Sequence, residues 1–142
     1  TMFVLAFGFG TDRVYQFGLG TPFDITAGVT FQKASPGIGF DSNPIGLAFN
    51  SDGTKIFIAG GDSDIITEYT LGSAFDVATW TAGSSFNVSD FDDGLQDVHF
   101  NADGSEMYVV GVTHDNVYLF ALETSFSLVG TISLLNSLYV GN

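Results

Sequence analysis

The sequence has no cysteine and very few basic residues. Without cysteine, the 142-residue chain has no disulfide, no thiolate zinc site and no cysteine nucleophile. Only Arg13, Lys33 and Lys55 are basic, against 16 acidic residues, and the formal net charge at pH 7 is −13. Nucleic-acid binding depends on Lys and Arg neutralising phosphates. The composition therefore predicts no nucleic-acid partner.

Long apolar runs are also missing from the sequence. No run approaches the roughly 18 residues of a membrane-spanning helix, so we expect no membrane insertion. The stretch 2–7 reads MFVLAF, which is too short for the core of a signal peptide and lacks a basic flank. The negative charge also disfavours docking on an anionic membrane, and it suits divalent cations or basic partners instead.

Apolar and aromatic residues are plentiful. Hydrophobic residues make up 45% of the chain and aromatic residues 15%, with 15 Phe. Val, Ile, Thr, Phe and Tyr dominate the apolar runs, and 18 Gly are spread singly between them. These residue types favour strands separated by turns, so the composition predicts an all-β protein with a sizeable core.

The chain repeats itself in its second and third parts. Residues 40–64 read FDSNPIGLAFNSDGTKIFIAGGDSD, and residues 91–115 read FDDGLQDVHFNADGSEMYVVGVTHD. The two segments align without a gap at an offset of 51 residues (91 − 40). Both carry the phrase Asn-x-Asp-Gly. This agreement indicates one structural unit that is used more than once.

A third copy lies at the start of the chain. Residues 14–25 read VYQFGLGTPFDI, which matches ITEYTLGSAFDV at 66–77 and VYLFALETSFSL at 117–128. Each unit is expected to form four strands, with hairpin turns at Asp52-Gly53 and Asp103-Gly104, because glycine readily adopts a positive φ. Within a unit the first strand is predicted at 46–49 or 97–100, and the second at 55–60 or 106–111. The third strand is predicted at 65–71 or 116–122, and the fourth at 28–32, 79–86 or 127–134.

A period near 50 residues with four strands is typical of a β-propeller blade. The phrases DGTKIFI and DGSEMYVV, followed by TEYTL or VYLFAL, resemble the YVTN-like propeller repeats of bacterial surface proteins and of marine phage and environmental sequences. The resemblance implies a β-propeller and an extracellular or virion location. It says little about function, because propellers serve many roles.

The three copies predict three blades, with a circular permutation. Blade one is expected at about 1–39 plus 137–142, blade two at about 40–90 and blade three at about 91–136. In this arrangement SLYVGN at 137–142 supplies the first strand of blade one. Three blades do not close a ring, which typically has four to eight. We therefore expect either a dimer with six blades or a fragment of a longer propeller.

Acidic clusters are the candidate metal sites. The candidate ligands for a hard cation such as Ca²⁺ are Asp90, Asp92, Asp93, Asp62 and Asp64. Their spacing does not fit an EF-hand. Aspartates also recur in register, which favours a role in turns. No cofactor is predicted, and Ca²⁺ is left as an alternative.

Few residues suit catalysis or ligand binding. His99 and His114 are the only histidines, and neither has a nucleophile motif nearby. Asp97 and His99 stand two apart in a predicted strand, so both face one side. Trp80 is a candidate for a glycan platform, together with Phe86, Tyr118 and Tyr139. In-register recurrence of most aromatic residues favours packing instead.

These observations predict a non-enzymatic propeller module for receptor or glycan binding, or for assembly. An alternative is a metal-assisted propeller hydrolase or lyase that uses Asp97 and His99. A further alternative is an excised or engineered repeat fragment without a function of its own.

Overall fold

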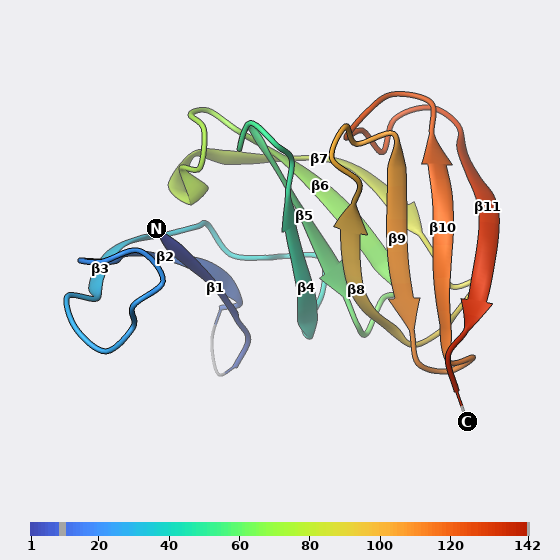
Figure 1. Ribbon diagram of the computed structural model, residues 1–142, viewed down its shortest axis with the longest axis horizontal. Coiled ribbons are helices and arrows are strands. Elements are labelled where there is room, and N and C mark those ends of the chain that lie inside the picture. The colour runs from blue at the N-terminus through green and yellow to red at the C-terminus, as the bar shows by residue number, and fades with distance from the viewer. Residues whose placement is uncertain (9–10, 142) are drawn as a thin grey trace.

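In the computed structural model, which describes residues 1–8 and 11–141, the chain is built of three antiparallel sheets that stand side by side (Figure 1). The first sheet has the strand order β1-β2-β3. Its strands are β1 (Met2–Ala6), β2 (Arg13–Gly18) and β3 (Thr30–Ala34). The prediction of an all-β, propeller-like architecture is confirmed.

The second and third sheets each have four strands in sequence order from the inside outward. The second contains β4 (Pro44–Phe49), β5 (Lys55–Gly60), β6 (Ile65–Leu71) and β7 (Trp80–Asn87). The third contains β8 (Leu95–Phe100), β9 (Glu106–Gly111), β10 (Asn116–Leu122) and β11 (Ile132–Tyr139). Within the described residues the helical elements are limited to the 3-10 turn η1 (Val77–Thr79), and no helix there is long and apolar enough to cross a membrane.

Apolar side chains fill the two spaces between neighbouring sheets. The core between the first and second sheets includes Val14, Ile56 and Ile58, which are fully buried. The core between the second and third includes Phe57 and Phe120, also fully buried. Successive side chains of a strand point to opposite faces, so Ile56 and Phe57 of β5 enter different cores. Strand β5, in the middle of the second sheet, is therefore apolar on both faces.

The fourth strand of the third sheet lies further along the chain than predicted. The sequence pattern placed it at 127–134, and the structure places it at Ile132–Tyr139. Leu122 pairs with Ile132, ten residues on, whereas Leu71 pairs with Trp80, nine residues on. The loop before β11 is thus one residue longer than the connection before β7, and the prediction mistook its residues 127–131 for strand.

Residues 137–139 belong to this outer strand. Tyr139 pairs with Asn116 of β10, and the Val140 N–H donates to the Asp115 carbonyl at 2.7 Å. The segment predicted to supply the first strand of blade one is therefore paired within the third sheet. Asn142 lies outside the described residues. In the first sheet, β1 pairs with β2 alone, and its other edge carries no strand among the described residues.

Candidate functional site

The candidate site is the polar side of β8, the innermost strand of the third sheet. Asp97 and His99 are exposed there, while Val98 and Phe100 between and after them are buried in the core. A bulge between Leu95 and Asp97 precedes the pair, and regular alternation resumes after it. The structure thus places Asp97 and His99 on one face of the strand.

Asp97 lies against the first strand of the neighbouring sheet. A Cβ atom added to Gly46 of β4 would lie 2.7 Å from the Asp97 Oδ1 and 2.9 Å from its Cα. Real Cβ atoms almost never approach this closely, so glycine at position 46 allows β4 and β8 to lie close together at Asp97. Sequence reasoning did not find this role, because it depends on a contact between two sheets. Asp97 also accepts a hydrogen bond from the Val98 N–H at 2.9 Å.

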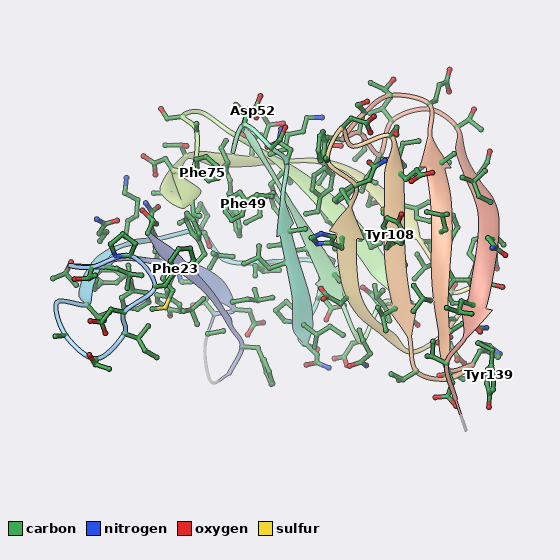
Figure 2. All side chains as sticks on the ribbon, viewed as in Figure 1. Phe23, Phe49, Asp52, Phe75, Tyr108 and Tyr139 are labelled. Carbon is green, nitrogen blue, oxygen red and sulfur yellow. The ribbon has the colours of Figure 1, made fainter. Side chains whose placement is uncertain are left out.

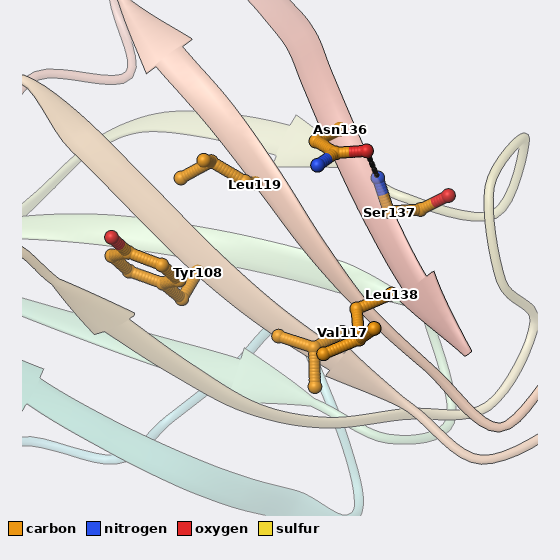
Figure 3. A pocket seen from close by; sticks show the side chains of 6 residues that line it. All are labelled: Tyr108, Val117, Leu119, Asn136, Ser137 and Leu138. Atoms are coloured by element: carbon orange, nitrogen blue, oxygen red, sulfur yellow. Dashed lines mark hydrogen bonds between the residues drawn. The ribbon is translucent and has the colours of Figure 1, made fainter. Parts of the chain in front are cut away.

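The same face of the third sheet continues into an apolar hollow. His99 pairs directly with Tyr108 of β9, so the two side chains share that face. The hollow is lined by Tyr108, Val117, Leu119, Asn136, Ser137 and Leu138 (Figure 3). Sequence reasoning did not find it, because these residues were expected to pack.

The hollow corresponds to a sheet-packing surface of the second sheet. At the 51-residue offset its residues Tyr108 and Val117 correspond to Phe57 and Ile66 of the second sheet. Phe57 and Ile66 are fully buried by the third sheet. The chemistry on this face is therefore concentrated at its inner rim, where Asp97 and His99 stand.

Asp92 is the most buried of the metal candidates, with a relative exposure of 1%. Its carboxylate accepts backbone N–H bonds from Gly94, Thr113 and His114 at 3.0 to 3.1 Å, and the Tyr118 hydroxyl lies 3.3 Å away. Burial raises the pKa of Asp92, but these hydrogen bonds outweigh it and the net pKa lies below the ordinary value of 3.8. The carboxylate ties the linker before β8 to the turn after β9.

One cluster in the described residues has the geometry to hold a cation: Asp92, Asp93 and His114. Asp93 and His114 are exposed, and the Asp92 oxygens already accept several N–H groups. Asp41 occupies the equivalent position in the second sheet and accepts from the Asn43 and Ser63 N–H groups in the same way. Asp92 and Asp41 thus stabilise equivalent turns in the two sheets, and the cluster around Asp92 fits a cation poorly.

The other acidic candidates do not converge. Asp62 accepts from the Ser42 hydroxyl. Asp64 has a left-handed backbone with φ of 53° and accepts from the Leu95 N–H at 3.0 Å, which links the turn of the second sheet to β8. Asp90 is exposed in the linker between β7 and β8. These side chains contribute to turns and linkers.

The Asp-Gly turns have one geometry in both complete sheets. Gly53 and Gly104 have φ values of 71° and 72°. Asp52 accepts from the Thr54 N–H at 2.9 Å, and Asp103 accepts from the Ser105 N–H at 2.9 Å. The hydroxyls of the same Thr and Ser donate as well, and these bonds lower the pKa of both aspartates.

Trp80 is not available to a glycan. Its relative exposure is 8%, and its ring stacks on Tyr69 with a centroid distance of 4.3 Å. Trp80 is the first residue of β7 and pairs with Leu71 of β6. Its indole packs in the core between the first and second sheets. Tyr118 is likewise buried and Phe86 packs on Phe120, whereas Tyr139 is 61% exposed.

All three basic side chains are engaged within the chain. Lys33 pairs with Asp76 at 2.7 Å, and Lys55 pairs with the buried Glu68 at 2.7 Å. Arg13 donates to the Ser35 carbonyl. Lys55 also donates to the Phe126 carbonyl, and Glu68 accepts from the Leu128 N–H, so this pair joins the second sheet to the third. Each of the three basic side chains therefore has at least one partner among the described residues.

Several solved structures share this fold. The chain is similar to a candidate 6-phosphogluconolactonase from Bacteroides uniformis, with a TM-score of 0.63 and 20% identity. It is similar to a protein of unknown function from Desulfotomaculum acetoxidans, with a TM-score of 0.57 and 19% identity. It is also similar to a protein from Lactobacillus plantarum, with a TM-score of 0.60 and 13% identity. No protein-family model and no curated protein matches the chain.

The matches cover most of this chain and a minor part of the others. They span 98%, 89% and 96% of this chain, but only 38%, 34% and 38% of the respective solved chains. The prediction of a non-enzymatic module is contradicted by the first of them, a candidate 6-phosphogluconolactonase. That prediction rested on the YVTN-like resemblance, the acidic composition and the lack of a catalytic motif, and none of these features excludes catalysis.

Proposed function

We propose that the chain contributes three blades to a β-propeller hydrolase that opens cyclic esters. The observation that carries the proposal is the exposed carboxylate and imidazole of Asp97 and His99 on the innermost strand of the third sheet, in a fold shared with a candidate lactonase. In β-propellers, as in other folds, the function depends on such sites and not on the scaffold.

The reaction needs little machinery. His99 accepts a proton from a water molecule whose oxygen forms a bond to the lactone carbonyl carbon. The ring C–O bond then breaks, and the proton passes to the departing oxygen, so the product is a hydroxy acid. General base catalysis of this kind contributes roughly 10²- to 10⁴-fold. Asp97, on the same face, stabilises the protonated imidazole.

The charges of the chain favour a lactone without phosphate. Arg13, Lys33 and Lys55 are all engaged with internal partners. A phosphorylated substrate would meet a chain with a formal net charge of −13 and few basic groups to offset it. We therefore infer that the preferred substrate is a neutral sugar lactone or a similar cyclic ester.

The proposal includes the way in which the ring is closed. Gly46 and Ala48, which correspond to Asp97 and His99, lie against the third sheet. In a closed propeller the pair would therefore stand at the junction of the third blade with the following blade, on the inner strand. Either a second copy, giving six blades, or further blades of a longer chain supply that neighbour. Light scattering after size exclusion distinguishes these, since only the first gives a dimer of this chain.

The activity test uses glucono-δ-lactone and its 6-phosphate, with proton release followed in a pH-stat and corrected for spontaneous hydrolysis. We expect turnover of the neutral lactone, and a loss of about 100-fold in kcat/KM in His99→Asn. His114→Asn is the matched control and should leave the rate unchanged, because His114 lies in the turn after β9.

Two outcomes would overturn the proposal. One is a rate equal to the blank for the chain under conditions in which it is folded. The other is equal rates for the wild type and His99→Asn. Carboxylate and imidazole are also ligands of divalent cations, so loss of activity with EDTA and recovery with Ca²⁺ or Zn²⁺ would assign a metal-assisted version.

A further inference from the structure

Three phenylalanines hold an unusual backbone conformation at equivalent places. Phe23, Phe75 and Phe126 have φ values of 61°, 58° and 51°. Positive φ is uncommon for a bulky residue and is maintained only where the surroundings determine it. In each loop the following residue donates its N–H to a carbonyl three residues back: Asp24 to Thr21, Asp76 to Ser73 and Ser127 to Thr124.

Two of these rings close over a glycine. A Cβ atom on Gly53 would lie 2.3 Å from the Phe75 ring, and one on Gly104 would lie 2.1 Å from the Phe126 ring. The Phe75 N–H donates to the Gly53 carbonyl at 2.7 Å, and the Phe126 N–H donates to the Gly104 carbonyl at 2.9 Å. Each ring therefore covers the Asn-x-Asp-Gly turn between the first two strands of its own sheet.

Phe23 has the same conformation and nothing to cover. Its relative exposure is 100%, against 41% for Phe75. Figure 2 shows Phe75 near Phe49 and below Asp52, and Phe23 over the first sheet. Its N–H has no acceptor within residues 1–8 and 11–141. The Phe23 loop therefore has the conformation of the Phe75 and Phe126 loops, but the described part of the first sheet contains no turn for its ring to cover.

In the described residues, the free edge of β1 lacks the strand that would lead into such a turn. β1 corresponds to β5, because Met2 pairs with Phe17 as Ile56 pairs with Tyr69. β5 also pairs with β4 on its other side, and β1 pairs with β2 alone among the described strands. The open edge, Met2–Ala6, carries no charge and no proline, which are the usual devices that block an exposed edge.

We propose that the open edge of β1 and the ring of Phe23 together bind one further β-strand that ends in an Asn-x-Asp-Gly turn. The strand pairs antiparallel with β1, in the register that β4 takes on β5. A residue equivalent to Phe49 lies opposite Met2, and one equivalent to Leu47 lies opposite Val4. Phe23 then closes over the glycine of the turn. Strand addition of this kind draws its affinity from main-chain hydrogen bonds and its specificity from side-chain pockets.

A second folded copy of the chain has no spare segment of this kind. The phrase Asn-x-Asp-Gly occurs in this sequence only at 50–53 and 101–104, and both copies already lie under Phe75 and Phe126. Residues 137–142 contain no Asp-Gly, and 137–139 are paired in β11. The occupant is therefore a segment outside residues 1–142 that has the sequence chemistry of residues 44–54.

The test is direct binding of a fluorescent peptide with the sequence PIGLAFNSDGT, which is residues 44–54. The comparison peptide replaces the glycine that corresponds to Gly53 with valine. Phe23→Ala is the variant of the chain, and Ile25→Ala in the same loop is its matched control, since Ile25 is also exposed, at 69%. Phe23 has no covering contact, so its removal leaves the fold intact.

We expect saturable binding of the parent peptide, measured by fluorescence anisotropy. The valine peptide and Phe23→Ala should each weaken it about tenfold or more, and Ile25→Ala less than about twofold. Amide hydrogen exchange should slow in β1 and not in β11 when the peptide is added. The proposal is overturned if the parent peptide does not saturate, if the valine peptide binds equally well, or if the slowed amides lie on β11.

Discussion

The second and third sheets carry the same repeat, yet they differ in what covers them. Phe57, Ala59 and Ile66 of the second sheet are fully buried, because the third sheet packs on them. Tyr108, Val110 and Val117 occupy the same positions in the third sheet and remain partly exposed. Equivalent positions of the repeat are thus covered in the second sheet and partly exposed in the third.

The two faces also differ in charge. Glu68 of the second sheet is buried and paired with Lys55, and the pair reaches the backbone of the third sheet at Phe126 and Leu128. The third sheet has Leu119 at the position of Glu68. The junction of the second and third sheets is therefore specified by a buried ion pair, and the next junction of the same kind has an apolar residue at that place.

The largest expected effect is a difference in the free energy of unfolding between a substitution on the covered face of the second sheet and one on the open face of the third. Phe57→Ala should lower the free energy of unfolding by about 3–5 kcal/mol, because a fully buried ring leaves a cavity. Tyr108→Ala at the equivalent position should cost about 1 kcal/mol or less, since its ring is partly in water. Urea unfolding followed by the fluorescence of Trp80 measures both. Equal losses would show that the third sheet is covered in solution.

The next effect concerns the buried ion pair. Lys55→Met should cost about 3 kcal/mol, because it leaves the buried carboxylate of Glu68 without its cation. Lys33→Met breaks the more exposed pair with Asp76 and should cost about 0–1 kcal/mol. The same urea titrations measure both variants. If the two substitutions cost the same, Glu68 is hydrated and the junction is looser than described.

The smallest effect is a pH dependence at Asp92. Its pKa is lower in the folded chain than the ordinary 3.8, so ionised Asp92 stabilises the fold at pH values above 3.8. This contribution is lost as the pH falls below 3.8 through the folded pKa. Asp92→Asn should cost about 1–3 kcal/mol at pH 7 and progressively less as the medium becomes acid. Melting temperatures of both proteins from pH 7 to pH 3 test this, and parallel curves would contradict it.

The sequence predicted the all-β, propeller-like fold, since alternation and turn chemistry are local. Gly53 and Gly104 identify their turns because positive φ is a property of the residue. The strand β11 was placed five residues too early (132 − 127), because the apolar residues of 127–131 resemble a strand although they lie in a loop. The YVTN-like resemblance and the extracellular or virion location stay predictions.

The candidate site was only partly predictable. Asp97 and His99 were found from their spacing of two, which fixes a common face. The burial of Trp80 and the need for Gly46 depend on contacts between sheets, which a single sequence does not reveal. Phe23 was visible as part of TPFDI, but its lack of a partner emerges only beside Phe75 and Phe126.

The central claim is that the edge of β1 and the ring of Phe23 bind a further β-strand, and the backbone amides of β1 test this claim most directly. Amide hydrogen exchange of Met2–Ala6 should be compared with that of Lys55–Gly60 in the same dilute sample. Since alternate N–H groups of an antiparallel edge strand face outward, we predict fast exchange at alternate residues of β1 and protection throughout β5. Addition of the 44–54 peptide should then protect β1 to the level of β5. Full protection of β1 without the peptide, or none with it, would contradict the account.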